Sequence, residues 1–87
     1  MVTRTIRIQS GAVYTGETAH EIVEQMRQAD FDPPPTVRDY IRRAVARASH
    51  YFDISLQVSE AGTEQEIAER FITAAINKGF AEEVTLS

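Results

Sequence analysis

The side chains that could act as acids, bases or metal ligands are few and scattered in this sequence. The 87 residues include two histidines and no cysteine, which excludes thiolate catalysis and cysteine-ligated metal sites. His20 and Glu24 lie one helical turn apart, but no third ligand lies nearby in the sequence, so we expect a solvated pair. His50 lies near Tyr51 and Asp53 at the end of an arginine-rich stretch, where a helix dipole favours a cation.

Motifs of nucleotide-binding and hydrolytic enzymes are also missing. The four glycines are spread singly along the chain, so there is no glycine-rich loop for a phosphate group. No serine lies in a nucleophile elbow. We therefore predict that the protein is not an enzyme, that it binds no metal ion or cofactor, and that it has no small-molecule substrate.

The arginines are concentrated in one part of the chain. Residues 31–50 contain four arginines and two aspartates, whereas residues 51–87 contain seven acidic and two basic residues. The four arginines are Arg38, Arg42, Arg43 and Arg47. Three interpretations stay open: a solvated face paired with Asp39 and with acids of a later helix, self-association with the acidic third of another copy, and binding to a polyanion such as nucleic acid.

Three stretches have the pattern of amphipathic helices, and each begins after a threonine that can cap a helix. The capping residues are Thr18, Thr36 and Thr63, each followed three residues later by an acid. We expect the first helix to end near Ala29, before a run of three prolines, and the third to end at Gly79. The second helix carries the arginines on one face and apolar residues on the other.

The start of the chain alternates between apolar and polar residues, which is typical of a β-hairpin. We expect Ser10 and Gly11 to form a two-residue loop. In this register Arg7 lies opposite Tyr14 on the outer face of the sheet, and both are candidate binding residues.

A second alternating stretch, from Tyr51 to Ser59, predicts a third strand, and Val84 and Leu86 indicate a short further strand at the end. We predict a single α+β domain over residues 1–87 in the order ββααβα, with three helices on one face of a small antiparallel-type sheet. The expected core residues are Ile6, Ile8, Val13, Ile22, Val23, Met26, Tyr40, Ile41, Val45, Ile54, Leu56, Ile67, Phe71, Ile72 and Ile76.

The overall composition is that of a folded protein. Hydrophobic residues make up 43% of the chain and charged residues 25%, with a net charge of −4 that opposes a general attraction to nucleic acid. No apolar run is long enough to span a bilayer or to serve as a signal peptide. We therefore expect a cytoplasmic protein that does not bind membranes.

Two segments of the chain resemble ribbon-helix-helix repressors. Residues 3–8, Thr-Arg-Thr-Ile-Arg-Ile, are similar to the family's strand, and residues 37–45, Val-Arg-Asp-Tyr-Ile-Arg-Arg-Ala-Val, to its second helix. In that family a ribbon of two strands, one from each subunit, enters the major groove. The resemblance implies base contacts from Thr3, Thr5 and Arg7, and phosphate contacts from Thr36 and Arg38.

A second resemblance covers most of the chain. Its residues are Gly11, Tyr14 and Gly16, then Glu21, Ile22, Val23 and Met26, then Asp39, Tyr40 and Ile41. They are similar to a pattern in small uncharacterised prokaryotic α+β proteins with the order hairpin, helix, helix, strand, helix. This resemblance implies a microbial cytosolic protein and no particular activity.

The aromatic residues Tyr14, Phe31 and Tyr51 would form an interaction surface if all three are exposed. We predict a small non-catalytic interaction or adaptor module, which forms a homodimer through unpaired sheet edges or docks on a larger protein. Its candidate contacts are Arg38, Arg42, Arg43, Arg47, Arg7 and Tyr14. The alternative is a DNA-binding regulator of the ribbon-helix-helix, antitoxin type.

Overall fold

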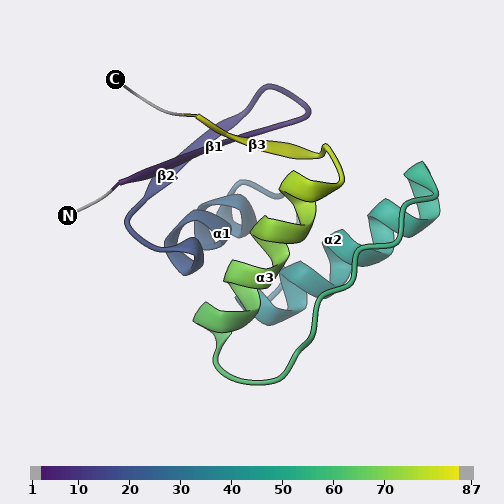
Figure 1. Cartoon of the computed structure of the whole chain (residues 1–87). Coiled ribbons are helices and arrows are strands. Elements are labelled where there is room, and N and C mark those ends of the chain that lie inside the picture. The colour runs from purple at the N-terminus through teal and green to yellow at the C-terminus, as the bar shows by residue number, and fades with distance from the viewer. Residues whose placement is uncertain (1–2, 85–87) are drawn as a thin grey trace.

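A three-stranded antiparallel sheet and three helices form an α+β fold in the computed structural model, which describes residues 3–84 (Figure 1). The elements are β1 (Arg4–Ile8), β2 (Val13–Gly16), α1 (Ala19–Gln28), α2 (Val37–Phe52), α3 (Glu64–Asn77) and β3 (Ala81–Val84). The predicted fold class is confirmed, and the order of elements is ββαααβ instead of ββααβα.

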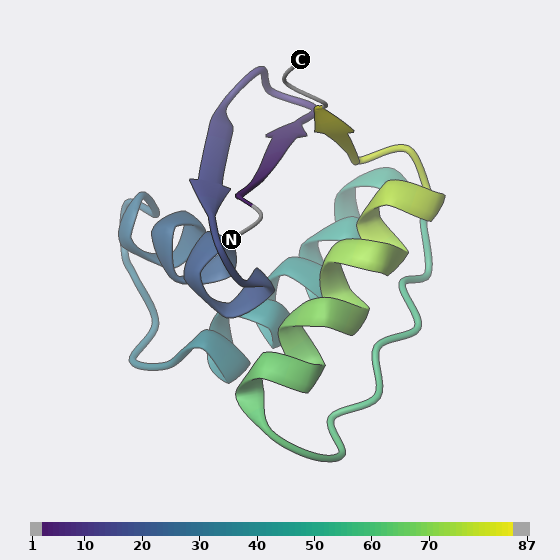
Figure 2. The same ribbon diagram turned by 60° about the vertical axis from the view of Figure 1, so that its left-hand side comes forward.

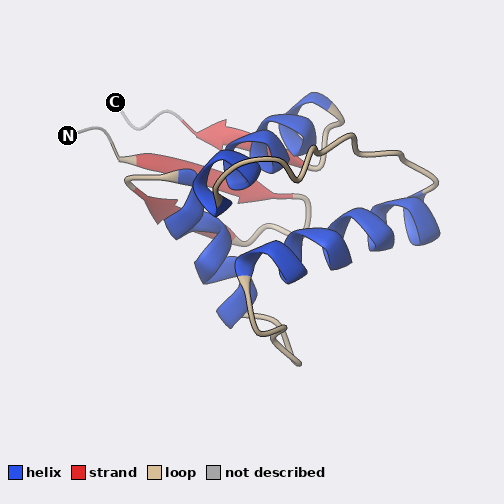
Figure 3. Ribbon diagram, turned by 90° about the horizontal axis from the view of Figure 1, so that it is seen from below, coloured by secondary structure: helices blue, strands red, loops and turns tan. Residues whose placement is uncertain are grey.

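The predicted third strand over residues 51–59 is wrong. Tyr51 and Phe52 form the last turn of α2, which ends at Asp53 in a left-handed conformation with φ 54°. Residues 53–63 then return past α2 to the start of α3, on the side of the helices away from the sheet (Figures 1 and 3). We call the alternating part of this stretch, residues 54–59, the return segment.

The sheet is completed by the end of the chain. β3 pairs antiparallel with β1, so that the strand order is β2-β1-β3, with Ala81 opposite Ile8 and Val84 opposite Thr5. The short strand expected near Val84 is therefore present, while Leu86 lies outside the described residues. Gly79, with φ +84°, turns the chain out of α3 and toward the free edge of β1.

The hairpin has a three-residue loop, and its register differs by one residue from the prediction. Gly11 donates from its backbone N–H to the carbonyl of Ile8, and Ile8 donates to the carbonyl of Ala12. Gly11 has φ +98°, which is the left-handed position that such a loop requires. Arg7 therefore lies opposite Val13, and Ile6 lies opposite Tyr14. A shift of one residue moves every side chain of a strand to the other face.

All three helices begin at the predicted threonines, whose side chains accept hydrogen bonds from backbone N–H groups in the first turn. The helices α1 and α3 cover the inner face of the sheet, with α1 packed under β2 and α3 leading into β3, while α2 packs against these two helices (Figure 2). The buried core residues are Ile6, Ala19, Ile22, Val23, Met26, Val37, Ile41, Ala48, Leu56, Ile67, Ala68, Phe71, Ile72 and Ala75. Val13 was expected in the core and is 55% exposed, because the register places it on the outer face.

Candidate binding sites

The arginines of α2 make contacts with nearby acids and carbonyl groups. Arg42 Nε donates to Glu60 Oε1 at 2.6 Å, and its Nη1 lies 3.6 Å from Asp39. The guanidinium of Arg38 donates to the carbonyls of Glu60 and Gly62 at 3.4 and 3.5 Å. These contacts hold the chain after the return segment against the start of α2.

The other two arginines of this face share one carboxylate. Arg43 and Arg47 lie 3.5 and 3.4 Å from Asp30, whose side chain is only 11% exposed. Arg43 also donates to the carbonyl of Asp32 at 2.6 Å. The arginines of α2 are thus largely paired. Asp39 is a partner, as expected. The other partners are two acids in loops, Asp30 and Glu60, and not the carboxylates of α3 that we expected.

Arg7 and Tyr14 do not lie together. Arg7 is exposed on the outer face of the sheet, where it forms an ion pair with Glu82. Tyr14 is half-buried and packs against the core beside the helices. The predicted pairing of these two residues across the hairpin is wrong, because the longer loop shifts the register by one residue.

The exposed aromatic side chains lie at two places on the surface. Phe31 is fully exposed in the loop between α1 and α2. Tyr51 and Phe52 are 71% and 55% exposed at the end of α2. The ring of Phe52 also packs edge-on against Phe80, with ring centres 5.4 Å apart. The alternation of the sequence placed Phe52 inside a strand, so its position at a helix end was missed.

The histidines make structural contacts. His20 Nε2 lies 3.2 Å from Glu64 Oε1 on α3, while Glu24 binds Arg27 instead of sharing a partner with His20. The ring of His50 packs edge-on against Tyr51, with ring centres 4.8 Å apart. Within residues 3–84, no three histidine, aspartate or glutamate side chains are grouped so that they could hold a metal ion.

The return segment has the alternating burial pattern of a β-strand, but no strand of the described chain pairs with it. Ile54, Leu56 and Val58 face the helices, while Ser55 and Gln57 are exposed. No hydrogen bond joins the backbone of residues 55–58 to any other part of the described chain. The backbone N–H and C=O groups of residues 55–58 are therefore available to a partner.

The direction of these backbone groups follows from the bonds at both ends of the stretch. Arg70 on α3 donates to the carbonyls of Ser59 and Ala61, at 3.1 and 2.5 Å. At the other end, the N–H of Ile54 donates to α2, at the carbonyl of Ala48. Backbone groups alternate in direction along an extended chain, so we infer from the bonds of Ser59 and Ala61 that the groups of Ser55 and Gln57 point to the α3 side.

A shallow hollow of about 420 Å³ lies on that side. Its lining residues are Gln57, Ser59, Glu69, Arg70, Thr73, Ala74 and Asn77. The floor is the outer surface of α3, where the side chains are small or polar. An exposed strand edge beside such a hollow is the arrangement that proteins use to bind an extended peptide.

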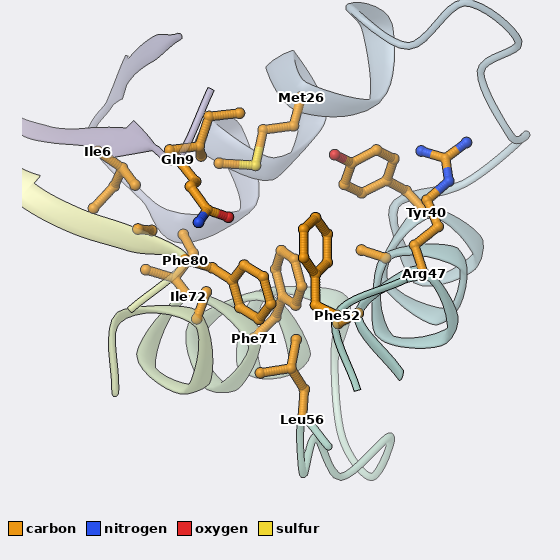
Figure 4. Close-up of a pocket in the computed structure, with 15 residues that line it drawn as sticks. Ile6, Gln9, Met26, Tyr40, Arg47, Phe52, Leu56, Phe71, Ile72 and Phe80 are labelled. Carbon is orange, nitrogen blue, oxygen red and sulfur yellow. The ribbon is translucent and has the colours of Figure 1, made fainter. Parts of the chain in front are cut away.

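A second concavity lies between the sheet and the C-terminal half of α2 (Figure 4). This cavity has a volume of about 290 Å³ and is lined mainly by aliphatic and aromatic side chains. Phe52, Phe71 and Phe80 form one wall, and Leu56 of the return segment closes the bottom (Figure 4). Its polar lining residues are Gln9, Tyr40 and Arg47.

Tyr40 is the half-buried polar group of this cavity. Burial is the largest cause that raises the pKa of the Tyr40 phenol above its usual value of 10. The nearby Tyr14 and Asp30 raise this pKa further, and Arg47 partly opposes the rise. The hydroxyl is therefore a hydrogen-bond donor at neutral pH. It points into the cavity, toward Met26 (Figure 4).

Comparison of the chain with protein-family models, with curated proteins and with solved structures finds no match in any of the three. Among the helices of residues 3–84, none combines the length and the apolar character needed to cross a bilayer.

Proposed function

We propose that this protein is a small non-catalytic adaptor module that docks on a larger protein by binding an extended segment of that partner. The peptide would add a strand to the return segment and lie in the hollow over α3. The observation that carries this proposal is the stretch of residues 55–58, whose backbone groups make no hydrogen bond within the described chain, beside a concave surface.

The chemistry of the hollow indicates the kind of peptide. Thr73, Ala74 and Asn77 have short side chains, so an extended peptide can lie close to the surface of α3. Backbone bonds to Ser55 and Gln57 would supply affinity without dependence on sequence. The occupant that we propose is therefore an extended stretch of the partner, bound mainly through its backbone.

Pairing of this edge with a second copy of the chain is less favourable than pairing with a peptide. Two copies that joined their return segments side by side would each bring α3 beneath the strand of the other. Neighbouring strands lie only about 4.8 Å apart, whereas a helix with its side chains is about 10 Å wide. The two helices would occupy the same space, so a partner without a helix under its strand is required.

The two outer sheet edges are also poorly suited to self-association. On β2, Gln25 of α1 donates to the carbonyl of Thr15 at 2.6 Å. On β3, Glu82 and Glu83 place charges along a strand of four residues. Side chains that cover an edge and charges on a short strand both discourage pairing between sheets.

DNA binding in the manner of ribbon-helix-helix repressors has less support. β1 is flanked on both sides by β2 and β3, whereas the ribbon of that family pairs the strand with its copy in a second subunit. Thr5 is 5% exposed and hydrogen-bonded to Thr15. Arg7 and Arg38 are engaged with Glu82 and with backbone carbonyls.

The test uses a library of random 12-residue peptides selected for binding to the whole chain. We expect selected peptides to slow hydrogen exchange at the amides of Ser55 and Gln57. We also expect Gln57→Pro, which removes the N–H group that points to the hollow, to weaken binding about tenfold, as expected for one lost hydrogen bond worth about 1.4 kcal/mol.

The matched control is Gln57→Ala, which removes the side chain that lines the hollow but keeps the backbone N–H, and which should weaken binding much less than Gln57→Pro. Circular dichroism and thermal melting establish that both variants are folded. The proposal is overturned if the library yields no binder, if bound peptides leave the amides of Ser55 and Gln57 unprotected, or if Gln57→Pro binds as well as Gln57→Ala.

A further inference from the structure

The apolar cavity between α2 and the sheet is a separate site, which shares no lining residue with the hollow over α3. Leu56 of the return segment lines the cavity, whereas Gln57 of the same segment lines the hollow. The cavity reaches the surface beside Gln9, Arg47 and Phe52, which are exposed lining residues. A small molecule can therefore enter it from solvent.

The size of the cavity sets the size of the ligand. Protein interiors contain few voids larger than a water molecule, so a volume of about 290 Å³ is unusual in a chain of 87 residues. This volume lies near the lower end of small-molecule sites, which begin at about 300 Å³. A dry apolar cavity of about 150 Å³ holds one benzene molecule, so this cavity has room for a ligand of about ten carbon atoms.

The wall of the cavity indicates the shape of the ligand. Four aromatic rings line it, those of Tyr40, Phe52, Phe71 and Phe80 (Figure 4). The thioether of Met26 on α1 also lines it (Figure 4). Aromatic rings and methionine sulfur both make favourable contacts with a further aromatic ring. A flat aromatic molecule therefore fits this wall.

The charges around the cavity indicate that the ligand is neutral. Arg47 is the one charged residue that lines it in the described part of the chain, and its guanidinium lies 3.4 Å from the carboxylate of Asp30. Burial raises the pKa of the Tyr40 phenol, so this group is uncharged at neutral pH. An ion in the cavity would lose its hydration without gaining an unpaired group of opposite charge.

We propose that this cavity binds a small neutral aromatic molecule of about ten carbon atoms, whose ring system lies against Phe52, Phe71 and Phe80. Burial of the apolar ring supplies the affinity, and its contacts with the surrounding rings supply the preference for an aromatic ligand. The cost of moving a charge into an apolar site makes the cavity select against ions of the same shape.

Fluorescence titration of the whole chain with 2-naphthol, which is uncharged at neutral pH, tests this site. The chain contains no tryptophan, so the emission of the naphthol ring can be followed apart from that of the protein. We expect saturable binding at one site and a rise in melting temperature with naphthol concentration. The anion 2-naphthoate, which has the same ring system, should bind more weakly by about tenfold or more.

Two variants fill the cavity from different sides. Ala44→Leu adds volume from α2, and Ala81→Leu adds volume from the sheet. Each should weaken the binding of 2-naphthol by about tenfold or more, because the added side chain occupies the space of the ring. Ala46→Leu is the matched control, because Ala46 lies on the exposed face of α2 outside the cavity, and it should bind like the original chain.

Circular dichroism and thermal melting establish that the three variants are folded. The proposal is overturned if 2-naphthol does not bind at a single saturable site, or if 2-naphthoate binds as tightly as 2-naphthol. It is also overturned if Ala44→Leu and Ala81→Leu both bind 2-naphthol as well as Ala46→Leu. None of these results affects the peptide site, which is tested separately through the N–H group of Gln57.

Discussion

The pKa of Glu24 on α1 depends on the side chains next to it. Arg27 donates to it from Nε at 2.8 Å, and the amide of Gln28 donates at 3.1 Å. These hydrogen bonds, that from Arg27 above all, lower the pKa of Glu24 from 4.5 to about 2. The sequence suggested a pairing of Glu24 with His20, but the structure turns His20 toward Glu64 on another helix.

The lowered pKa of Glu24 predicts a dependence of stability on pH. Because the pKa is lower in the folded state, the stabilisation is complete above about pH 4.5 and disappears as the pH falls toward 2. Both side chains are partly exposed, so screening limits the contribution of the pair to about 1 kcal/mol. We expect Glu24→Gln to lower the free energy of unfolding by about this amount at neutral pH and to have little effect near pH 2.

Urea denaturation at the two pH values measures this difference. Glu17→Gln is the control, because Glu17 is exposed on the surface before α1 and should change stability little at either pH. A loss of stability in Glu24→Gln that is equally large at both pH values would contradict the assigned role of the carboxylate.

At the scale of elements, the start of α3 is fixed by a reciprocal cap. The Thr63 hydroxyl accepts from the N–H of Glu66 at 3.2 Å, and the Glu66 carboxylate accepts from the N–H of Thr63 at 3.1 Å. Gly62 leaves space for this carboxylate, because a Cβ atom there would lie 2.9 Å from Glu66 Oε1. The spacing of these residues in the sequence was enough to predict the cap.

Loss of the cap should destabilise the protein measurably. We expect Thr63→Ala to lower the free energy of unfolding by about 1 kcal/mol, which corresponds to a decrease in melting temperature of about 4–8 °C. Thr73→Ala, in the exposed middle of the same helix, should have no such effect or a small stabilising one, because alanine favours helices. Equal melting temperatures for Thr63→Ala and the original chain would show that the cap adds nothing.

The return segment explains where sequence reasoning failed at this scale. Period-two alternation over Ile54, Leu56 and Val58 indicates an extended chain with one buried face, and the structure has both features. Alternation does not specify what covers the buried face or whether a neighbouring strand exists. Here helices cover the buried face, Arg70 binds the carbonyl of Ser59 at the end of the segment, and Arg38 binds the carbonyl of the next residue, Glu60.

At the scale of the whole molecule, one core joins the sheet to all three helices. Ile41 of α2 is 2% exposed and belongs to the same buried cluster as Ile6, Ile22 and Ile72. A charge at this position would lie in an apolar interior without a partner, at a cost of about 5 kcal/mol or more. That is a large part of the roughly 4–13 kcal/mol expected for a domain of this size.

We therefore expect Ile41→Asp to abolish cooperative unfolding, or to lower the melting temperature by tens of degrees, in a thermal melt followed by circular dichroism. The control is Ala46→Asp, on the exposed face of the same helix, which should change the melting temperature by only a few degrees. An Ile41→Asp variant that melts like Ala46→Asp would show that α2 does not pack on the core through this face.

The candidate sites were only partly accessible to sequence reasoning. The arginines of α2 were recognised as a charged face, but their acidic partners Asp30 and Glu60 lie in loops whose paths the sequence does not specify. The cavity was not expected at all. Its lining residues come from five elements and from loops, and apart from Gln9 and Arg47 each of them taken alone has the pattern of a core position.

By itself the sequence determined the caps, the starts of the three helices, the ends of α1 and α3, the presence of the hairpin and most of the core, because these depend on contacts between residues close in the chain and on the periodicity of apolar side chains. Only the tertiary structure decided that the last strand pairs with β1, that the return segment stays unpaired, and that a cavity separates the C-terminal half of α2 from the sheet. These features depend on which distant segments meet in space. Local propensity and periodicity carry no information about such contacts, since several arrangements bury the same apolar faces.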